Sequence, residues 1–156
     1  MESLDLRVLA DAMAWRRSGH DVTLVTVVQT WGSAPRPPGA LLAVRGDGIV
    51  SGSVSGGCVE DDLITRIKSG ERSDRPAMIA YGVSQAEAAR FGLPCGGTLL
   101  LVQEPLTDAG WIEEVLQQTA SYHLVSRTLS LATGHVAVAE ATRGQGMQFD
   151  GLTLTT

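Results

Sequence analysis

The sequence predicts a single domain in which helices flank a mixed β-sheet, of the α/β class or, if helices and strands segregate, of the α+β class. Two observations lead to this prediction. The chain has 156 residues, 44% of them hydrophobic and 19% charged, which is typical of one globular domain. Runs with helical periodicity also alternate along the chain with short runs of β-branched and aliphatic residues.

Four segments carry helical signals. Residues 4–17 have apolar side chains at helical spacing, and Gly19 supplies a stop signal. Residues 59–69 predict a second helix, with acidic side chains in the first turn and basic ones in the last, an order that matches the helix dipole. Its predicted buried stripe consists of Val59, Leu63, Ile64 and Ile67. Ser84 can cap a short third helix, and Thr107 can cap a fourth. The apolar positions of the first helix are Leu6, Leu9, Ala10, Met13 and Ala14, and those of the fourth are Trp111, Ile112, Val115 and Leu116.

The strand signals fall between these helices. Residues 22–30 are almost entirely apolar or β-branched, which predicts a central strand covered on both faces. ALLAV and IVSG around Gly-Asp-Gly predict a hairpin. Further strands are predicted at 76–82 and 98–105, and residues 122–156 contain three strand-like runs. Because the sequence stops within the apolar run LTLTT, we expect a further domain to follow in the natural protein.

Composition argues against several classes of partner. The net charge is −5 and no cluster of Lys and Arg occurs, which disfavours nucleic acid and anionic membranes. No apolar run approaches the roughly 20 residues of a membrane span, and the first residues lack the features of a signal peptide. We therefore expect a cytoplasmic protein with reduced cysteines. The three histidines are widely spaced, so no metal site is predicted.

The first candidate binding segment is WGSAPRPPGA, residues 31–40. Its prolines stiffen the backbone and hold Arg36 between Pro35 and Pro37. A guanidinium on a stiff loop suits planar, bidentate binding of a phosphate or carboxylate. The alternative is a rigid loop whose arginine pairs with a neighbouring acidic side chain.

The second candidate is GSVSGGCVEDDL, residues 52–63, a glycine-rich turn that leads into a helix. Such a turn offers free N–H groups and the positive end of the helix dipole to an anion. Ser53 and Ser55 add hydroxyl donors, and a helix N-terminus should lower the pKa of Cys58. The opposing interpretation rests on the acids of the first turn, Glu60, Asp61 and Asp62. These could satisfy the dipole themselves, repel an anion and raise the pKa of the thiol.

The third candidate is GLPCGGTLLLVQEP, residues 92–105, in which Cys95 precedes a glycine pair and a buried strand. Cys95 is either a ligand-binding thiol or a packing residue. If the strand at 98–105 runs antiparallel to its neighbour, Cys58 and Cys95 lie at the same edge of the sheet and can share one ligand.

Taken in order, GSAPRPPGA (32–40), SGSVSGGCVE (51–60) and GLPCGGTLLLVQEP (92–105) resemble the XdhC/CoxI family, whose members are accessory proteins of molybdenum hydroxylases. The motifs lie within residues 31–105, and the resemblance loosens beyond them. Carried over residue by residue, it implies a cofactor-binding set that consists of Ser33, Arg36, Ser53, Ser55, Gly56, Gly57, Cys58, Glu60, Cys95, Gly96 and Gly97.

The resemblance implies a maturation factor rather than an enzyme. Such a factor binds molybdenum cofactor (molybdopterin) as cargo, supports its sulfuration with a cysteine desulfurase and inserts it into a molybdenum hydroxylase apoenzyme such as xanthine dehydrogenase or CO dehydrogenase. Longer family members also carry a C-terminal Rossmann-like domain that residues 1–156 do not contain, and we expect a homo-oligomer. Two alternatives remain: a small thiol-dependent enzyme that uses Cys58, and a docking module for a partner enzyme.

Overall fold

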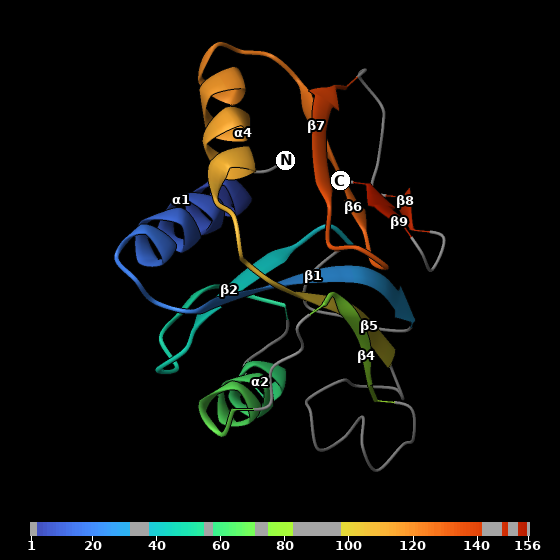
Figure 1. Cartoon of the computed structure of the whole chain (residues 1–156). Coiled ribbons are helices and arrows are strands. Elements are labelled where there is room, and N and C mark those ends of the chain that lie inside the picture. Colours follow the sequence, from blue (N-terminus) through green and yellow to red (C-terminus); the bar gives the residue numbers. More distant parts are fainter. Residues whose placement is uncertain are drawn as a thin grey trace.

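The computed structural model describes residues 3–31, 38–54, 58–70, 75–82, 98–141, 148–149 and 153–155. Within these ranges the chain forms a five-stranded sheet, a four-stranded sheet and the helices α1 (Ser3–Arg17), α2 (Cys58–Lys68) and α4 (Gly110–Ala120). Figure 1 shows α2 below the five-stranded sheet, with α1, α4 and the four-stranded sheet above it. The predicted combination of helices that flank a sheet is confirmed.

The five-stranded sheet has the strand order β3-β2-β1-β5-β4. Its strands are β1 (Val22–Trp31), β2 (Leu41–Arg45), β3 (Val50–Gly52), β4 (Ala77–Tyr81) and β5 (Thr98–Pro105). The central place of β1 agrees with its sequence, because a strand that is buried on both faces has no need of alternating polar residues. The predicted hairpin is confirmed as β2 and β3, which pair antiparallel around the turn that contains Gly48.

The strand directions correct one part of the prediction. A mixed sheet was expected, but every strand pairing in the described ranges is antiparallel. The reason lies in the crossover through α2, which leads from β3 at one edge of the sheet to β4 at the other. The strands β2, β1 and β5 lie between the two strands that this crossover joins, so β3 and β4 do not pair with each other. A sheet with only antiparallel pairs and its helices on the faces has the character of the α+β class.

Helix α2 covers one face of the five-stranded sheet. Val59, Leu63 and Ile67 follow a helical spacing and are almost fully buried against the sheet. Burial of a side chain of this size stabilises the fold by about 1.5–3 kcal/mol. The predicted apolar stripe of this helix is therefore confirmed. The strand residues in the same cluster are Val25, Val27, Leu42, Val44, Tyr81, Leu99 and Leu101.

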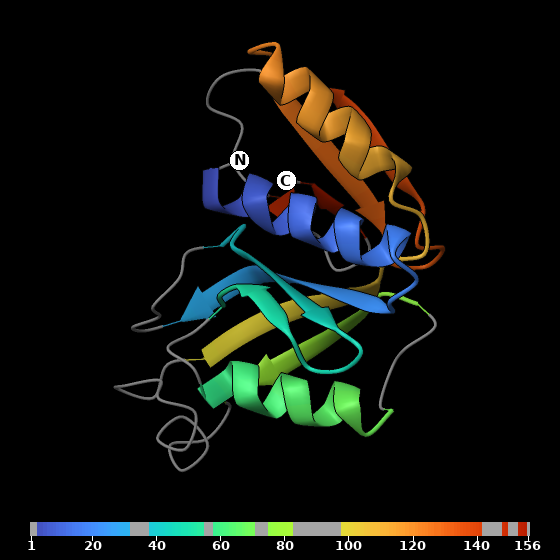
Figure 2. The ribbon, with the colours of Figure 1, turned by 90° about the vertical axis from the view of Figure 1, so that its left-hand side faces the viewer.

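The other face is shared by α1 and the four-stranded sheet. That sheet has the order β7-β6-β9-β8 and comprises β6 (Val125–Ser130), β7 (Val136–Glu140), β8 (Gln148–Phe149) and β9 (Thr153–Thr155). The predicted strands near the end of the chain are thus confirmed, but they form a sheet of their own. Figure 2 shows α1 lying between the five-stranded sheet and α4. The residues that α1 buries most completely are Val8, Leu9 and Ala12.

A buried ion pair joins the two sheets. Arg127 of β6 and Glu104 of β5 are 2% and 4% exposed, and Arg127 Nη1 donates a hydrogen bond of 2.6 Å to Glu104 Oε1. The Arg127 guanidinium also lies 4.6 Å from the ring centroid of Trp111 on α4. A buried charge needs a partner, and this one has a carboxylate and an aromatic face. The contact fixes how β6 and α4 sit on β5.

Two details of the helices differ from the prediction. Helix α4 has Ala109 at its N-cap position with no side-chain hydrogen bond, so Thr107 does not cap it. Asp108 instead accepts the Gly110 N–H at 2.8 Å. On α1, Ala14 is exposed whereas Val8 is fully buried, so the buried stripe is rotated from the predicted one. The packing of α1 against β2 and α4 decides this rotation, and helical periodicity alone does not specify it.

Candidate functional site

The strand ends that flank the first and third motifs lie at the same end of the five-stranded sheet. Strand β1 ends at Trp31, just before residues 32–37, and β5 begins at Thr98, just after residues 83–97. Trp31 and Thr98 are direct partners in the antiparallel register. Figure 2 shows both strand ends on the left side of the sheet. The first motif therefore leaves the sheet where the third motif enters it.

The second motif leads to this end as well. Strand β3 is antiparallel to β2, which is antiparallel to β1, so β3 and β1 run in the same direction. The chain leaves β3 at Gly52 and begins α2 at Cys58, which Figure 2 places on the same side as the ends of β1 and β4. From the sequence, Cys58 and Cys95 are predicted to lie at one edge of the sheet on the condition that the strand at 98–105 is antiparallel to its neighbour. The strand β5 meets this condition, because it is antiparallel to both of its neighbours. The distance between the Cys58 and Cys95 sulfur atoms stays a prediction.

Most residues of the predicted binding set lie outside the described ranges. These are Ser33, Arg36, Ser55, Gly56, Gly57, Cys95, Gly96 and Gly97. Cys58 is described as the first residue of α2, without its side chain. Ser53 and Glu60 are described completely, and they show how the glycine-rich turn is anchored on each side.

Ser53 and Gly52 anchor the turn to the sheet and to α1. The Ser53 N–H donates a hydrogen bond of 3.2 Å to the Leu41 carbonyl. Gly52 has a φ of +90°, and a Cβ atom at this position would lie 2.3 Å from the Leu41 oxygen and 2.6 Å from Val8 Cγ2. No side chain fits there. This glycine of the motif therefore serves close packing rather than a ligand.

Glu60 anchors the turn to the helix. Its side chain is buried, with 8% of the residue exposed, and its Oε1 accepts the Val54 N–H at 2.9 Å. Val54 is itself fully buried. An acid in the first turn that reaches back to an upstream N–H is a common way to fix the path by which the chain enters a helix. Glu60 thus has a structural contact, and its role in cofactor binding stays a prediction.

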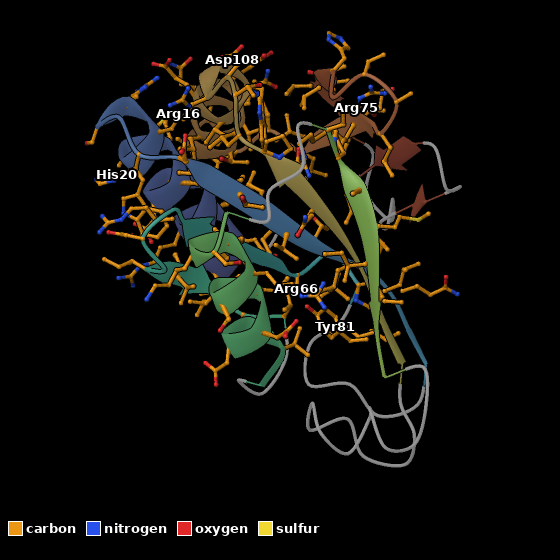
Figure 3. The ribbon with its side chains drawn as sticks, turned by 60° about the horizontal axis from the view of Figure 1, so that its bottom comes forward. Arg16, His20, Arg66, Arg75, Tyr81 and Asp108 are labelled. Carbon is orange, nitrogen blue, oxygen red and sulfur yellow. The ribbon has the colours of Figure 1, made fainter. Side chains whose placement is uncertain are left out.

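Asp62 has two partners, one at the end of β4 and one a turn further along α2. Its Oδ2 accepts a hydrogen bond of 2.6 Å from the Tyr81 hydroxyl and forms an ion pair of 2.9 Å with Arg66 Nε. The Arg66 guanidinium also lies 5.7 Å from the centroid of the Tyr81 ring. Figure 3 shows Arg66 on α2 beside Tyr81 at the end of β4. Tyr81 is 1% exposed and pairs with Leu99 of β5.

Sequence reasoning did not find the contact between Tyr81, Asp62 and Arg66. The spacing of four between Asp62 and Arg66 is a signal for an ion pair along one helix. Tyr81 carries no such signal, because its contact depends on how α2 lies across β4. The contact brings the first half of α2 to the point where β4 ends and β5 begins.

Other ionisable groups give no sign of a second chemical centre in the described ranges. No group of three or more His, Cys, Asp or Glu side chains that could hold a metal occurs there. The described histidines are His20, which follows α1, and His123 and His135, which flank β6 and β7. Among the described helices, none is long and apolar enough to cross a membrane.

Comparison with known proteins supports the resemblance seen in the motifs. The model of the XdhC and CoxI family matches residues 15–82. The molybdenum cofactor insertion chaperone PaoD of Escherichia coli strain K12 is 37% identical over 111 residues, which are 71% of this chain and 35% of that protein. A protein of Bacillus subtilis strain 168, described as a probable subunit of xanthine dehydrogenase, is 32% identical over 90 residues, which are 56% of this chain and 27% of that protein.

A solved structure supports the fold. The crystal structure of a xanthine dehydrogenase from Bacillus halodurans superposes with a TM-score of 0.72 at 19% identity, over 97% of this chain and 52% of that one. At this identity the likeness concerns the fold alone. The chain spans about a third or less of the curated relatives and about half of the solved one. Residues 15–82, from the end of α1 to the end of β4, are thus similar to the XdhC and CoxI family.

Proposed function

We propose that this chain takes part in the insertion of molybdenum cofactor into a molybdenum hydroxylase, and that it holds the cofactor as cargo at the end of the five-stranded sheet. The proposal is carried by the 37% identity to a molybdenum cofactor insertion chaperone. The convergence of the strand ends around all three motifs supports it, because a cargo of this size needs contacts from several segments at once.

The chemistry of the motifs fits both ends of the cargo. Molybdopterin has a phosphate at one end and a dithiolene that holds molybdenum at the other. Arg36 and the N-terminus of α2 suit the phosphate, since a guanidinium and free backbone N–H groups both bind oxyanions. Cys58 and Cys95 suit the metal or sulfur end, because thiolates are soft ligands. The finer role is support of sulfuration with a cysteine desulfurase, followed by transfer to an apoenzyme such as xanthine dehydrogenase or CO dehydrogenase.

The experiment is a titration with molybdenum cofactor released anaerobically from a donor molybdoenzyme. Co-elution of the protein with the pterin and with molybdenum is the readout. We expect the wild-type chain to retain both. Arg36→Ala should weaken binding by about 1.5–3 kcal/mol, the usual contribution of a hydrogen bond to a charged group. Arg36→Lys should restore binding only in part, because lysine lacks the planar fork.

The matched control is Arg7→Ala, which removes an exposed arginine on α1. Its affinity should equal that of the wild type. Equal affinity of the wild type and Arg36→Ala would remove Arg36 from the site. A wild-type chain that retains neither pterin nor molybdenum would contradict cofactor binding altogether and favour a docking module.

A further inference from the structure

The two edge strands of the five-stranded sheet differ in how well they are covered. At one edge, β3 has only three residues, and α1 holds it through a hydrogen bond of 2.6 Å that the Ser51 hydroxyl donates to Asp11 Oδ2. At the other edge, β4 has five residues, and in the part of the chain that the structure describes it pairs with β5 alone. The outer edge of a strand offers N–H and C=O groups with which another chain can pair.

The sequence of β4 lacks the features that usually protect such an edge. Its five residues, Ala-Met-Ile-Ala-Tyr, include no charge and no proline, whereas β7 at an edge of the other sheet ends on Glu140. Met78 is 51% exposed, and Ala80 is exposed on the same face. Met78 and Ala80 pair with Val102 and Leu100 of β5, which belong to the apolar cluster between the two sheets. This cluster therefore continues to the surface along β4.

The five residues of β4 are complementary to a second copy of themselves. Two identical strands related by a two-fold axis pair antiparallel, and only one register pairs all five residues, with Ile79 opposite Ile79 of the second copy. In this register Met78 lies opposite Ala80, and Ala77 lies opposite Tyr81. A large side chain thus meets a small one at every position except the centre, so neighbouring side chains fit beside one another.

The charged groups at the ends of β4 also agree with an antiparallel pairing. Figure 3 shows Arg75 at the start of β4 and Tyr81 near its end. Asp62, which accepts a hydrogen bond of 2.6 Å from the Tyr81 hydroxyl, is 21% exposed there. The two-fold axis brings Arg75 of each copy toward the end of the other that carries Asp62, and not toward a second Arg75. Because Asp62 already pairs with Arg66, this contribution is small, and the strand edge provides most of the association.

We propose that β4 is a homodimer interface, at which two copies of this chain join their five-stranded sheets into one continuous antiparallel sheet centred on Ile79. This interface goes beyond the proposed function and does not depend on it. Because β4 runs in the same direction as β1, the dimer places the two candidate sites at opposite ends of the joined sheet. One pair of five-residue strands is smaller than the roughly 800 Å² per partner of a standard interface, so the dimer should be weak and should dissociate on dilution.

Sedimentation equilibrium of the whole chain, from micromolar to near-millimolar concentrations, measures this association. We expect a monomer–dimer equilibrium for the wild type. Met78→Lys places a charge at both contacts between Met78 and Ala80 and should raise the dissociation constant about 10-fold. Leu124→Lys is the matched control, because Leu124 is also 51% exposed but lies next to β6 in the other sheet. It should leave the dissociation constant unchanged, and circular dichroism checks that both variants are folded.

Disulfide trapping tests the register in a background that carries Cys58→Ser and Cys95→Ser. Ile79→Cys should form a covalent dimer on mild oxidation, because directly opposite residues of an antiparallel pair have Cα atoms about 4.5–5.5 Å apart, within the range that a disulfide spans. Met78→Cys and Ala80→Cys should cross-link with each other in a mixture, and much less each with itself.

Three outcomes would overturn the proposal. A wild type that stays monomeric over the whole concentration range would leave the edge of β4 to a strand of another protein. A dimer that Met78→Lys does not weaken, and in which Ile79→Cys does not cross-link, would use another surface. Self-cross-linking of Met78→Cys without cross-linking of Ile79→Cys would place the two strands in a different register.

Discussion

The two faces of the five-stranded sheet are held by different kinds of contact. The face under α2 is apolar along its length, and its polar contacts gather at one end, where Glu60 and Asp62 bind Val54 and Tyr81. The face under α1 and the four-stranded sheet contains the buried charges of Glu104 and Arg127. On one face the polar groups hold the first turns of a helix in place. On the other face they fix the position of one sheet relative to the other.

This difference shows how the fold separates stability from the candidate site. An apolar face tolerates small shifts of a helix, because dispersion contacts have little direction. The polar contacts of Glu60 and Asp62 remove that freedom at the end of the sheet where the strands that border the three motifs begin or end. Between the two sheets, the ion pair of Arg127 with Glu104 restricts such shifts in the middle of the molecule. The following predictions test this contrast, beginning with the largest expected effect.

Arg127→Met should lower the free energy of unfolding by about 3–5 kcal/mol, because it leaves the buried Glu104 carboxylate without its partner. Denaturant titration measures the loss. Arg17→Met, which breaks an ion pair whose side chains are 52% and 50% exposed, should cost no more than about 1 kcal/mol. The double variant Glu104→Leu with Arg127→Met should recover much of the loss. A single variant as stable as the wild type would show that the two faces do not differ in this way.

Gly52→Ala should lower the free energy of unfolding by about 2–4 kcal/mol, because its Cβ atom would collide with the Leu41 carbonyl and with α1. Gly70 is the matched control: its φ is +89°, close to that of Gly52, but nothing lies within 4 Å of the position of its Cβ atom. Gly70→Ala should cost about 1 kcal/mol, from backbone strain alone. Equal losses in thermal or chemical unfolding would mean that the contact between β3 and α1 is not tight.

Tyr81→Phe should cost about 1 kcal/mol of stability, less than a fully buried hydrogen bond to a charged group, because Asp62 is partly exposed. The phenyl ring keeps the apolar packing of the α2 face, so the loss isolates the hydroxyl. Hydrogen exchange should show the effect as faster exchange at the start of α2, with β1 unchanged. Loss of protection throughout the sheet would contradict a contact that acts at one end.

The smallest effect belongs to the β2–β3 turn, outside both faces. Arg45 donates Nε and Nη2 to the two carboxylate oxygens of Asp47, each at 2.8 Å. These side-chain hydrogen bonds hold the pKa of Asp47 at about 2, below its ordinary value of 3.8. The folded-state pKa is the lower one, so the stabilisation is fully present above about pH 4 and disappears as the pH falls through 2.

An NMR titration of the Asp47 carboxyl carbon should give this low pKa. The melting temperature of Asp47→Asn should lie slightly below that of the wild type at pH 6, and the gap should narrow as the pH falls from 4 toward 2. A gap that does not change with pH would contradict an ionic contribution from this turn.

Local patterns in the sequence were enough to predict most elements. The apolar run of β1 and the stripe and charge order of α2 are properties of neighbouring residues, and both appear as predicted. The rotation of α1, the separate sheet of β6–β9 and the antiparallel directions depend on contacts between distant segments. No periodicity encodes them.

The candidate site divides in the same way. The motifs in the sequence locate the turn before α2, and the pairing of β1, β2, β3 and β5 adds that the strand ends that border the three motifs lie at one end of the sheet. The sequence did not predict the polar contact of Tyr81, because a tyrosine that ends an apolar strand resembles a core residue. Its hydroxyl meets Asp62, which is 19 residues away in sequence, only once α2 lies across β4.

The central strand pair also determines the order of events during synthesis. Val27 of β1 pairs with Leu101 of β5. Between these two paired strands, the chain forms β2, β3, α2 and β4. Contacts between distant segments form slowly, since a long loop must close first. Until residue 105 has left the ribosome, the ten-residue strand β1 has one unpaired edge, and the proposed cofactor site lacks the strand β5 that borders it. A nascent chain that has not reached β5 therefore presents a free edge of β1, the kind of edge with which another chain can pair.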